Sequence, residues 1–220
     1  MALSFNLEFF RNVVVSMIAL ILSITVHEFG HAFVADRLGD RLPRSQGRVT
    51  LNPIAHMSLL GTLALPLVGL LIGGFVIGWG KPVQISPVSF TRKLRMKTGH
   101  LLVAIAGPLM NILFGIVITL IALGVTALGL VRNLEVLRAM YSAVYLNFLL
   151  AFFNLVPIPP LDGSAVLAGF LPDRSRVLAF LHQYGLYLLI LVFVVPQAQV
   201  IFRVPAQALT LFWFGLVGVR

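Results

Sequence analysis

Asn12-Val-Val-Val-Ser-Met-Ile-Ala-Leu-Ile-Leu-Ser-Ile-Thr-Val26 runs directly into His27-Glu28-Phe29-Gly30-His31, and the apolar Ala32-Phe-Val-Ala35 follows. As a helix this segment is long enough to cross a bilayer, which takes about 20 residues. Ionisable side chains at that depth cost free energy unless they are paired, so they indicate a functional site. On a helix, His27 and His31 share one face and can bind one metal ion. Glu28 then lies beside the ion, where a general base would stand.

The composition excludes a soluble globular domain. The chain has 220 residues, of which 59% are hydrophobic and only 10% are charged. These values predict an all-α polytopic membrane protein, in contact with the lipid bilayer. There is no cysteine, so a zinc site has to use histidine and carboxylate. The net charge of +9 comes from bases scattered over short connections, which favours lipid headgroups over nucleic acid as the partner.

Six apolar segments cover roughly residues 7–35, 58–78, 99–131, 137–156, 177–196 and 200–218. They predict about five to six transmembrane helices in a single domain, residues 1–220, with a catalytic core at about 7–170 and additional C-terminal helices at about 177–218. Polar connections separate the first three segments. Within them, residues 47–53 and 81–85 are expected to form short membrane-associated β strands.

The second apolar segment decides the topology. If all six segments crossed once, Asp162 would emerge on the face opposite His31. If residues 58–78, interrupted by Pro66 and several glycines, enter and return as a re-entrant segment, both residues lie on one face. That face then carries 12 of the 16 basic residues, which the positive-inside rule places in the cytoplasm. Two short crossings in this region would also return the chain to the same face and would place Asp162 on the side of His31.

Two histidines leave a catalytic zinc ion short of one protein ligand and a water. The chain offers few carboxylates, namely Glu8, Glu28, Asp36, Asp40, Glu135, Asp162 and Asp173. Asp162 is the best candidate for the third ligand, although Asp36 and Asp40 are not excluded. Three prolines between residues 157 and 160 end the preceding helix, and the extended chain after them could carry Asp162 back to the metal.

Several motifs together resemble the site-2 protease family of intramembrane zinc metalloproteases. They are His27-Glu28-x-x-His31, Gly47-Arg-Val-Thr-Leu-Asn-Pro-Ile-Ala-His56, Gly80-Lys-Pro-Val83, Ala106-Gly-Pro-Leu-Met-Asn111 and Asn154-Leu-Val-Pro-Ile-Pro-Pro-Leu-Asp-Gly163. The resemblance implies His27, His31 and Asp162 as ligands of one Zn²⁺ and Glu28 as the catalytic base. It also implies a substrate-binding or oxyanion role for Asn154.

The chain departs from that family in two respects. Many relatives have His-x-Asp-Pro where this chain has His56-Met-Ser-Leu59, and the chain is too short for the PDZ or CBS modules of longer relatives. Some residues also keep a second interpretation. Asn154 could simply bond to helix backbone, Asn111 could accompany a helix kink, and His56 could be a ligand, a proton carrier or an interfacial residue.

We therefore expect an intramembrane zinc metalloprotease of a prokaryotic cell membrane, with its active site towards the cytoplasm. It would hydrolyse a peptide bond in or near the transmembrane segment of a single-span protein, and the extended segments could hold the unwound substrate by β-addition. The alternative is a divalent-metal transporter that uses the His-x-x-x-His helix, but such a transporter gives Glu28 no task.

Overall fold

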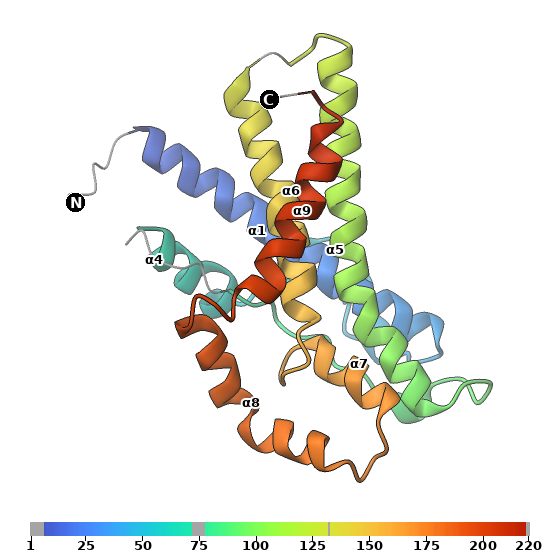
Figure 1. The fold of residues 1–220 in the computed structure, drawn as a ribbon. Coiled ribbons are helices and arrows are strands. Elements are labelled where there is room, and N and C mark those ends of the chain that lie inside the picture. The colour runs from blue at the N-terminus through green and yellow to red at the C-terminus, as the bar shows by residue number, and fades with distance from the viewer. Residues whose placement is uncertain (1–6, 72–77, 132, 219–220) are drawn as a thin grey trace.

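The computed structural model describes residues 7–71, 78–131 and 133–218, and these residues form helices and loops (Figure 1). The long helices are α1 (Leu7–Arg37), α5 (Met96–Ala127), α6 (Leu134–Asn154), α8 (Arg176–Val194) and α9 (Val200–Gly215). The short ones are α2 (Leu42–Ser45), α3 (Pro53–His56), α4 (Leu65–Leu71) and α7 (Asp162–Phe170), with a π-helical turn at Leu59–Ala64 and a 3₁₀ turn at Pro87–Ser89. No strand occurs in the described residues, so the predicted β strands are not confirmed.

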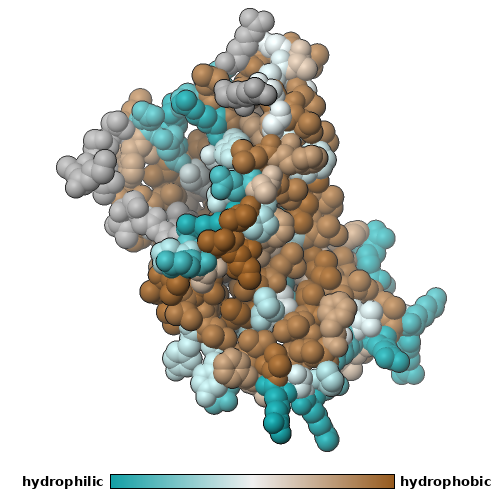
Figure 2. Space-filling model, viewed as in Figure 1, coloured by the Kyte–Doolittle hydropathy of each residue, from teal (hydrophilic) through white to brown (hydrophobic). Residues whose placement is uncertain are grey.

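Four helices are long and apolar enough to span a membrane, namely α1, α5, α6 and α8. The helical stretch Leu59–Leu71 and α9 are apolar but shorter. Hydrophobic residues cover most of the face seen in Figure 2, and many large apolar side chains are exposed along these helices. A surface of this kind is expected where lipid, and not water, surrounds the protein. The all-helical membrane architecture predicted from the sequence is therefore confirmed at this level.

Helices α1, α5 and α6 form the core of the fold. Small residues let the backbones approach, as is common between membrane helices. A Cβ added at Gly30 of α1 would lie 2.6 Å from the carbonyl oxygen of Ala106 in α5. One added at Gly115 of α5 would lie 2.6 Å from the ring of Phe148 in α6. This close packing brings the middle of α5 against the part of α1 that carries the histidines.

The long connection between α1 and α5 folds back on itself. Near its start and end, the Thr91 amide donates to the carbonyl of Leu38 at 2.6 Å. Further along, the Trp79 amide donates to the carbonyl of Gly61 at 3.0 Å, and the Thr62 hydroxyl donates to the carbonyl of Trp79 at 2.8 Å. The apolar segment predicted at 58–78 therefore begins and ends at neighbouring positions, although residues 72–77 lie outside the described part of the chain.

The two C-terminal helices contact different parts of α6. The end of α8 packs through Val192 with Val156 just after α6, and a Cβ at Gly185 in mid-helix would lie 2.9 Å from the carbonyl oxygen of Pro159. Thus α8 stays near the C-terminal end of α6. By contrast, α9 runs along α6 from Phe202, beside Phe153, to Phe214, beside Tyr141.

Candidate metal centre

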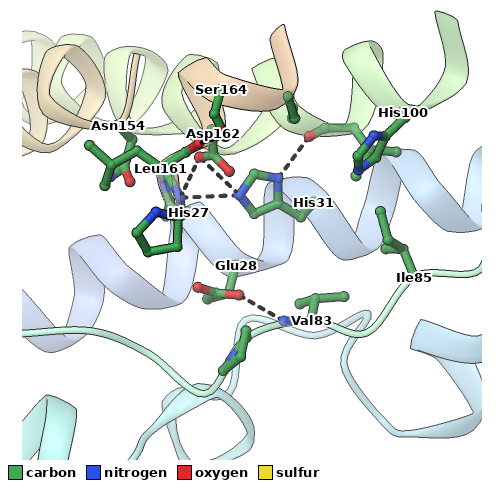
Figure 3. A pocket seen from close by; sticks show the side chains of 15 residues that line it. His27, Glu28, His31, Val83, Ile85, His100, Asn154, Leu161, Asp162 and Ser164 are labelled. Atoms are coloured by element: carbon green, nitrogen blue, oxygen red, sulfur yellow. Dashed lines mark hydrogen bonds and ion pairs between the residues drawn. The ribbon is translucent and has the colours of Figure 1, made fainter. Parts of the chain in front are cut away.

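Three potential ligands converge between α1, α5 and α7. The Nε2 atoms of His27 and His31 are 3.1 Å apart, and Asp162 Oδ2 lies 3.1 Å from the first and 3.3 Å from the second (Figure 3). All three side chains are largely buried. Among the described residues they form the one group of histidine and acidic side chains that could hold a metal ion. The structure thus brings together the ligands predicted from the two distant motifs.

Hydrogen bonds on the far side of each ring determine which histidine nitrogen is free. His31 Nδ1 lies 2.7 Å from the carbonyl oxygen of Val103, which can only accept, so Nδ1 carries the proton. His27 Nδ1 lies 2.6 Å from Asn111 Oδ1. Both Nε2 atoms are then bare lone pairs that point toward Asp162, the form in which imidazole binds a metal.

The orientation of the Asn111 amide is itself determined by backbone. Its NH₂ group donates to the carbonyl of Ser23 at 3.0 Å and to Asn147 Oδ1 at 2.9 Å. Asn147 in turn donates to the carbonyl of Ala143 at 2.9 Å. Backbone carbonyls accept only, so neither amide can flip without losing a bond. The chain of amides from α6 through α5 therefore holds His27 in its metal-binding tautomer.

A cation fits this donor set. Asp162 Oδ2 is buried and has no hydrogen-bond partner in the described part of the chain, and a buried acceptor without a partner is costly. Two imidazole lone pairs and one carboxylate oxygen facing each other repel unless a positive charge lies between them. Two histidines, one carboxylate and an open position are the ligand set of a catalytic zinc site.

Asp162 reaches the site in a different way from that expected. It is the first residue of helix α7 and does not lie on an extended strand. The following Gly163 has no room for a side chain, because a Cβ there would collide with the backbone carbonyls of Leu155 and Val156. The chain therefore doubles back tightly after α6, and α7 starts directly against His27 and His31 of α1.

Glu28 lies on the opposite side of α1 from α7, against the loop that precedes α5 (Figure 3). Its Oε2 accepts a hydrogen bond from the Val83 amide at 3.2 Å. A Cβ at Gly80 would lie 3.2 Å from both the Glu28 Cγ and Oε1 atoms. The base predicted from the motif is therefore packed and oriented, close to the ligands but not among them.

Ligands and base line one pocket of about 310 Å³. Pro82, Val83 and Ile85 form its loop side, and His100 lines it from α5. Asn154 lines it too, and its NH₂ donates to the carbonyl of Leu150 at 2.9 Å. That bond matches the alternative in which Asn154 bonds to helix backbone. It uses one of the two N–H donors of the side-chain amide and leaves the second N–H and the carbonyl oxygen available. A larger cavity of about 620 Å³ lies between the N-terminal ends of α1 and α6, with no histidine in its lining.

The remaining candidates are engaged elsewhere. The Asp36 carboxylate pairs with Arg44 at 2.6 Å. Asp40 accepts hydrogen bonds from the amides of Leu42 and Ser86.

His56 is buried, and its Nε2 donates to the carbonyl of Thr50 at 2.9 Å. Burial lowers the pKa of His56, and the residue does not belong to the group that could hold a metal ion.

Sequence reasoning missed two parts of the site. Asn147 is a polar residue in the middle of an apolar helix, and this alone marks it as a functional candidate in a membrane protein. The Val83 amide gave no such signal, because a backbone donor is present at every residue that is not proline. The Gly80-Lys-Pro-Val83 motif located the segment but not the contact.

These features define a class: a membrane-embedded metallohydrolase with an HExxH helix and a distant aspartate. The model of Peptidase family M50 matches residues 15–135 and 123–195. The chain is 34% identical over 189 residues to the Bacillus subtilis (strain 168) protein called "Putative zinc metalloprotease YwhC", with 82% of this chain and 80% of that protein covered. The chain belongs to the M50 family, which contains the site-2 proteases, and is an intramembrane zinc metalloendopeptidase.

Two further relatives share the description of a zinc metalloprotease under the name Rip2. The protein from Mycolicibacterium smegmatis is 32% identical over 184 residues, and that from Mycobacterium tuberculosis (strain H37Rv) is 33% identical over 178 residues. Each alignment covers 80% of this chain and 65% of the relative. No solved structure matches significantly. None of these matches favours the transporter alternative, and the bacterial relatives suggest a prokaryotic origin.

Proposed function

We propose that His27, His31 and Asp162 hold the zinc ion and that Glu28 is the catalytic base of peptide-bond hydrolysis. The observation that carries this assignment is the convergence of two bare imidazole nitrogens and a carboxylate oxygen that has no other partner. When bound there, zinc supplies Lewis-acid chemistry, which acidifies a water molecule and polarises a carbonyl. The protein has to provide a proton acceptor next to it.

Glu28 meets that requirement. One carboxylate oxygen is fixed by the Val83 amide, so the group is held in place and needs no reorganisation during the reaction. Glu28 takes a proton from the attacking water and returns it to the nitrogen of the leaving amine. Asn154 would donate a hydrogen bond to the scissile carbonyl, and its position in the wall of the same pocket supports this role.

The substrate is a membrane protein with a single span, cut in or near that span. A helical substrate hides its amides in hydrogen bonds four residues back, so it must unwind before attack. Residues 81–83 do not offer it a free strand edge. The Lys81 amide donates to the carbonyl of His56 at 2.8 Å, and the Val83 amide is bonded to Glu28. β-Addition of the substrate is therefore left to residues 84–85 of this segment or to residues 47–56.

The site opens to the cytoplasm, and residues 58–78 form a re-entrant segment. Support comes from the contact of Thr91 with Leu38 and from a bond of 2.6 Å between the amides of Gln46 and Gln84. These bonds join the chain before the segment to the chain after it. Most of the basic residues lie in the same connection or its flanks, which the positive-inside rule assigns to the cytoplasm.

The catalytic assignment is tested by Glu28→Gln, with a single-span substrate co-expressed in the same membrane. We expect cleavage to be lost while the purified variant keeps its zinc, because Glu28 is not a ligand. Glu135→Gln, an exposed residue in the larger cavity at the far end of the molecule, is the matched control and should cleave normally. Undiminished cleavage by Glu28→Gln would reject the assignment.

The topology is tested by labelling, and the lack of native cysteine makes the background clean. Ser45→Cys and Thr91→Cys place one thiol on each side of residues 58–78. In intact spheroplasts, a membrane-impermeant maleimide should label neither, and after lysis it should label both. If only one of the two is labelled before lysis, residues 58–78 cross the membrane. If both are labelled, the site faces outward.

A further inference from the structure

Arg48 is a buried cation in the connection between α1 and α5, and only 4% of the residue is exposed. Among the described residues no carboxylate forms an ion pair with it. Its guanidinium instead donates to three backbone carbonyls. Nη1 bonds to Ala55 at 2.5 Å and to Lys81 at 3.1 Å, and Nη2 lies 3.4 Å from the oxygen of Pro82. A buried charge is costly unless it is fully hydrogen-bonded, so this arrangement needs an explanation.

The three carbonyls belong to two separate parts of the connection. One lies in α3, and the other two lie in the loop that forms the pocket wall beside Glu28. The Lys81 amide adds a bond of 2.8 Å to the carbonyl of His56. Residues 81–82 are thus tied to residues 55–56 directly, through the Lys81 amide, and indirectly, through the Arg48 guanidinium. The next amide along the loop, that of Val83, is the donor to Glu28.

We infer that Arg48 is a positioning residue for the catalytic base, acting through the loop 80–83 and the Val83 amide. This inference rests on the proposed role of Glu28. The loop is not part of a strand ladder, so its position depends on a few separate bonds, of which Arg48 supplies those to the Lys81 and Pro82 carbonyls. A guanidinium suits the task because it is planar and presents five donors in a rigid fork, whereas a lysine ammonium is a flexible point charge. Arg48 itself touches neither ligand nor reacting atom.

The test compares Arg48→Met with Arg41→Met, an exposed basic residue of the same connection. For Arg48→Met we expect kcat to fall about 10- to 100-fold, since small displacements of a catalytic group cost about that much. KM should change by about twofold at most, and the zinc content should stay at wild-type level, because the ligands lie on the helices. Arg48→Lys should recover only part of the rate. Arg41→Met should match wild type.

A second variant distinguishes positioning from general destabilisation. Val83→Pro removes the donor to Glu28 and leaves Arg48 and its carbonyls in place. If Arg48 acts through that donor, the double variant Arg48→Met/Val83→Pro should be no slower than Val83→Pro alone, because coupled residues are not additive. Full additivity of the two effects would overturn the inference, and so would loss of zinc in Arg48→Met.

Failure of the proposed function gives a different pattern. If Glu28→Gln keeps its activity, Glu28 is not the base, whatever the Arg48 variants show. If Glu28→Gln is inactive with zinc bound and Arg48→Met is fully active, only the role of Arg48 is rejected. Hydrogen exchange of the peptide that contains Val83 provides an independent readout. It should become faster in Arg48→Met and stay unchanged in Arg41→Met.

Discussion

The catalytic pocket has two walls that are built on different principles. The helical wall consists of α1, α5, α6 and α7, and its histidines are oriented by carbonyls and amides of neighbouring helices. The loop wall consists of residues 80–85, held by a buried arginine and by the backbone of His56. The first wall positions the three proposed metal ligands, and the second positions Glu28, the proposed base.

This division means that metal binding and proton transfer can be damaged separately. A change in the helical wall should alter the affinity for zinc and thereby the activity. A change in the loop wall should alter the rate while the metal stays bound. The following variants test whether the two walls are as independent as the contacts indicate.

The largest effect is expected from Asp162→Asn, which removes the charge of the third ligand. The two histidines alone hold zinc weakly, so the purified variant should contain little metal and cleave nothing detectable. Zinc per chain is measured by atomic absorption, alongside cleavage in membranes. Asp173→Asn, in an exposed pair with Lys97, is the control and should keep both. A zinc-replete Asp162→Asn enzyme would contradict the ligand assignment.

Gly107→Ala should be the next most severe, and it acts on the helical wall. An added Cβ would collide with the His31 ring and lie 2.7 Å from Cε1 of His27. Displaced ligands should lower the affinity for zinc by about 10- to 100-fold, the range seen when the supports of metal ligands are altered. Competition with a chelator measures it. Gly124→Ala lies in the same helix with nothing within 4 Å, and it should bind zinc as the wild type does.

Gly80→Ala makes the same chemical change in the loop wall. Its Cβ would lie 2.7 Å from Ile24 and 3.2 Å from the Glu28 carboxylate. We expect kcat to fall about 10-fold, because the base is displaced, with zinc affinity unchanged in the chelator assay. If Gly80→Ala lost zinc as readily as Gly107→Ala, the two walls would not be independent.

The smallest effect is expected far from both walls. Arg11 in α1 pairs with Glu135 in α6 at 2.7 Å, and both side chains are nearly half exposed. Exposed pairs of this kind contribute about 0–1 kcal/mol to stability. Arg11→Met should therefore shift thermal unfolding by a few degrees at most and leave cleavage and zinc content unchanged. A strong loss of cleavage would show that the outer ends of α1 and α6 control the site.

The helical wall could be predicted from the sequence, because its signals are local and periodic. The spacing of His27 and His31 determines a shared helix face, and the apolar segments indicate the helices. Pairing with Asp162 followed from the scarcity of carboxylates. The chain of amides behind His27 was not predicted, since it depends on how three helices pack around Asn111. Asn147, a polar residue in the middle of an apolar helix, could have been recognised from the sequence but was not among the predicted site residues.

The loop wall could not be predicted to the same degree. Alternation in residues 81–85 suggested a strand, but a strand needs a neighbouring strand. In the structure this segment is bonded instead to the Arg48 side chain, the Glu28 side chain and the carbonyl of His56. Arg48 looked like one more surface base in a basic connection. Its burial is a property of the folded loop, and its place in the Gly47–His56 motif does not reveal that it is buried.

The hydrogen bonds between Gly61, Thr62 and Trp79 have a consequence for how this protein can be engineered. They join residues 61–62 to Trp79, directly before the loop wall, and add to the bonds from Arg48 and His56 that hold residues 81–82. We therefore expect the position of the loop wall to depend little on the length of chain between Thr62 and Trp79. A tag could therefore be inserted between Thr62 and Trp79, or this stretch could be lengthened or shortened, while the loop wall keeps its position against Glu28.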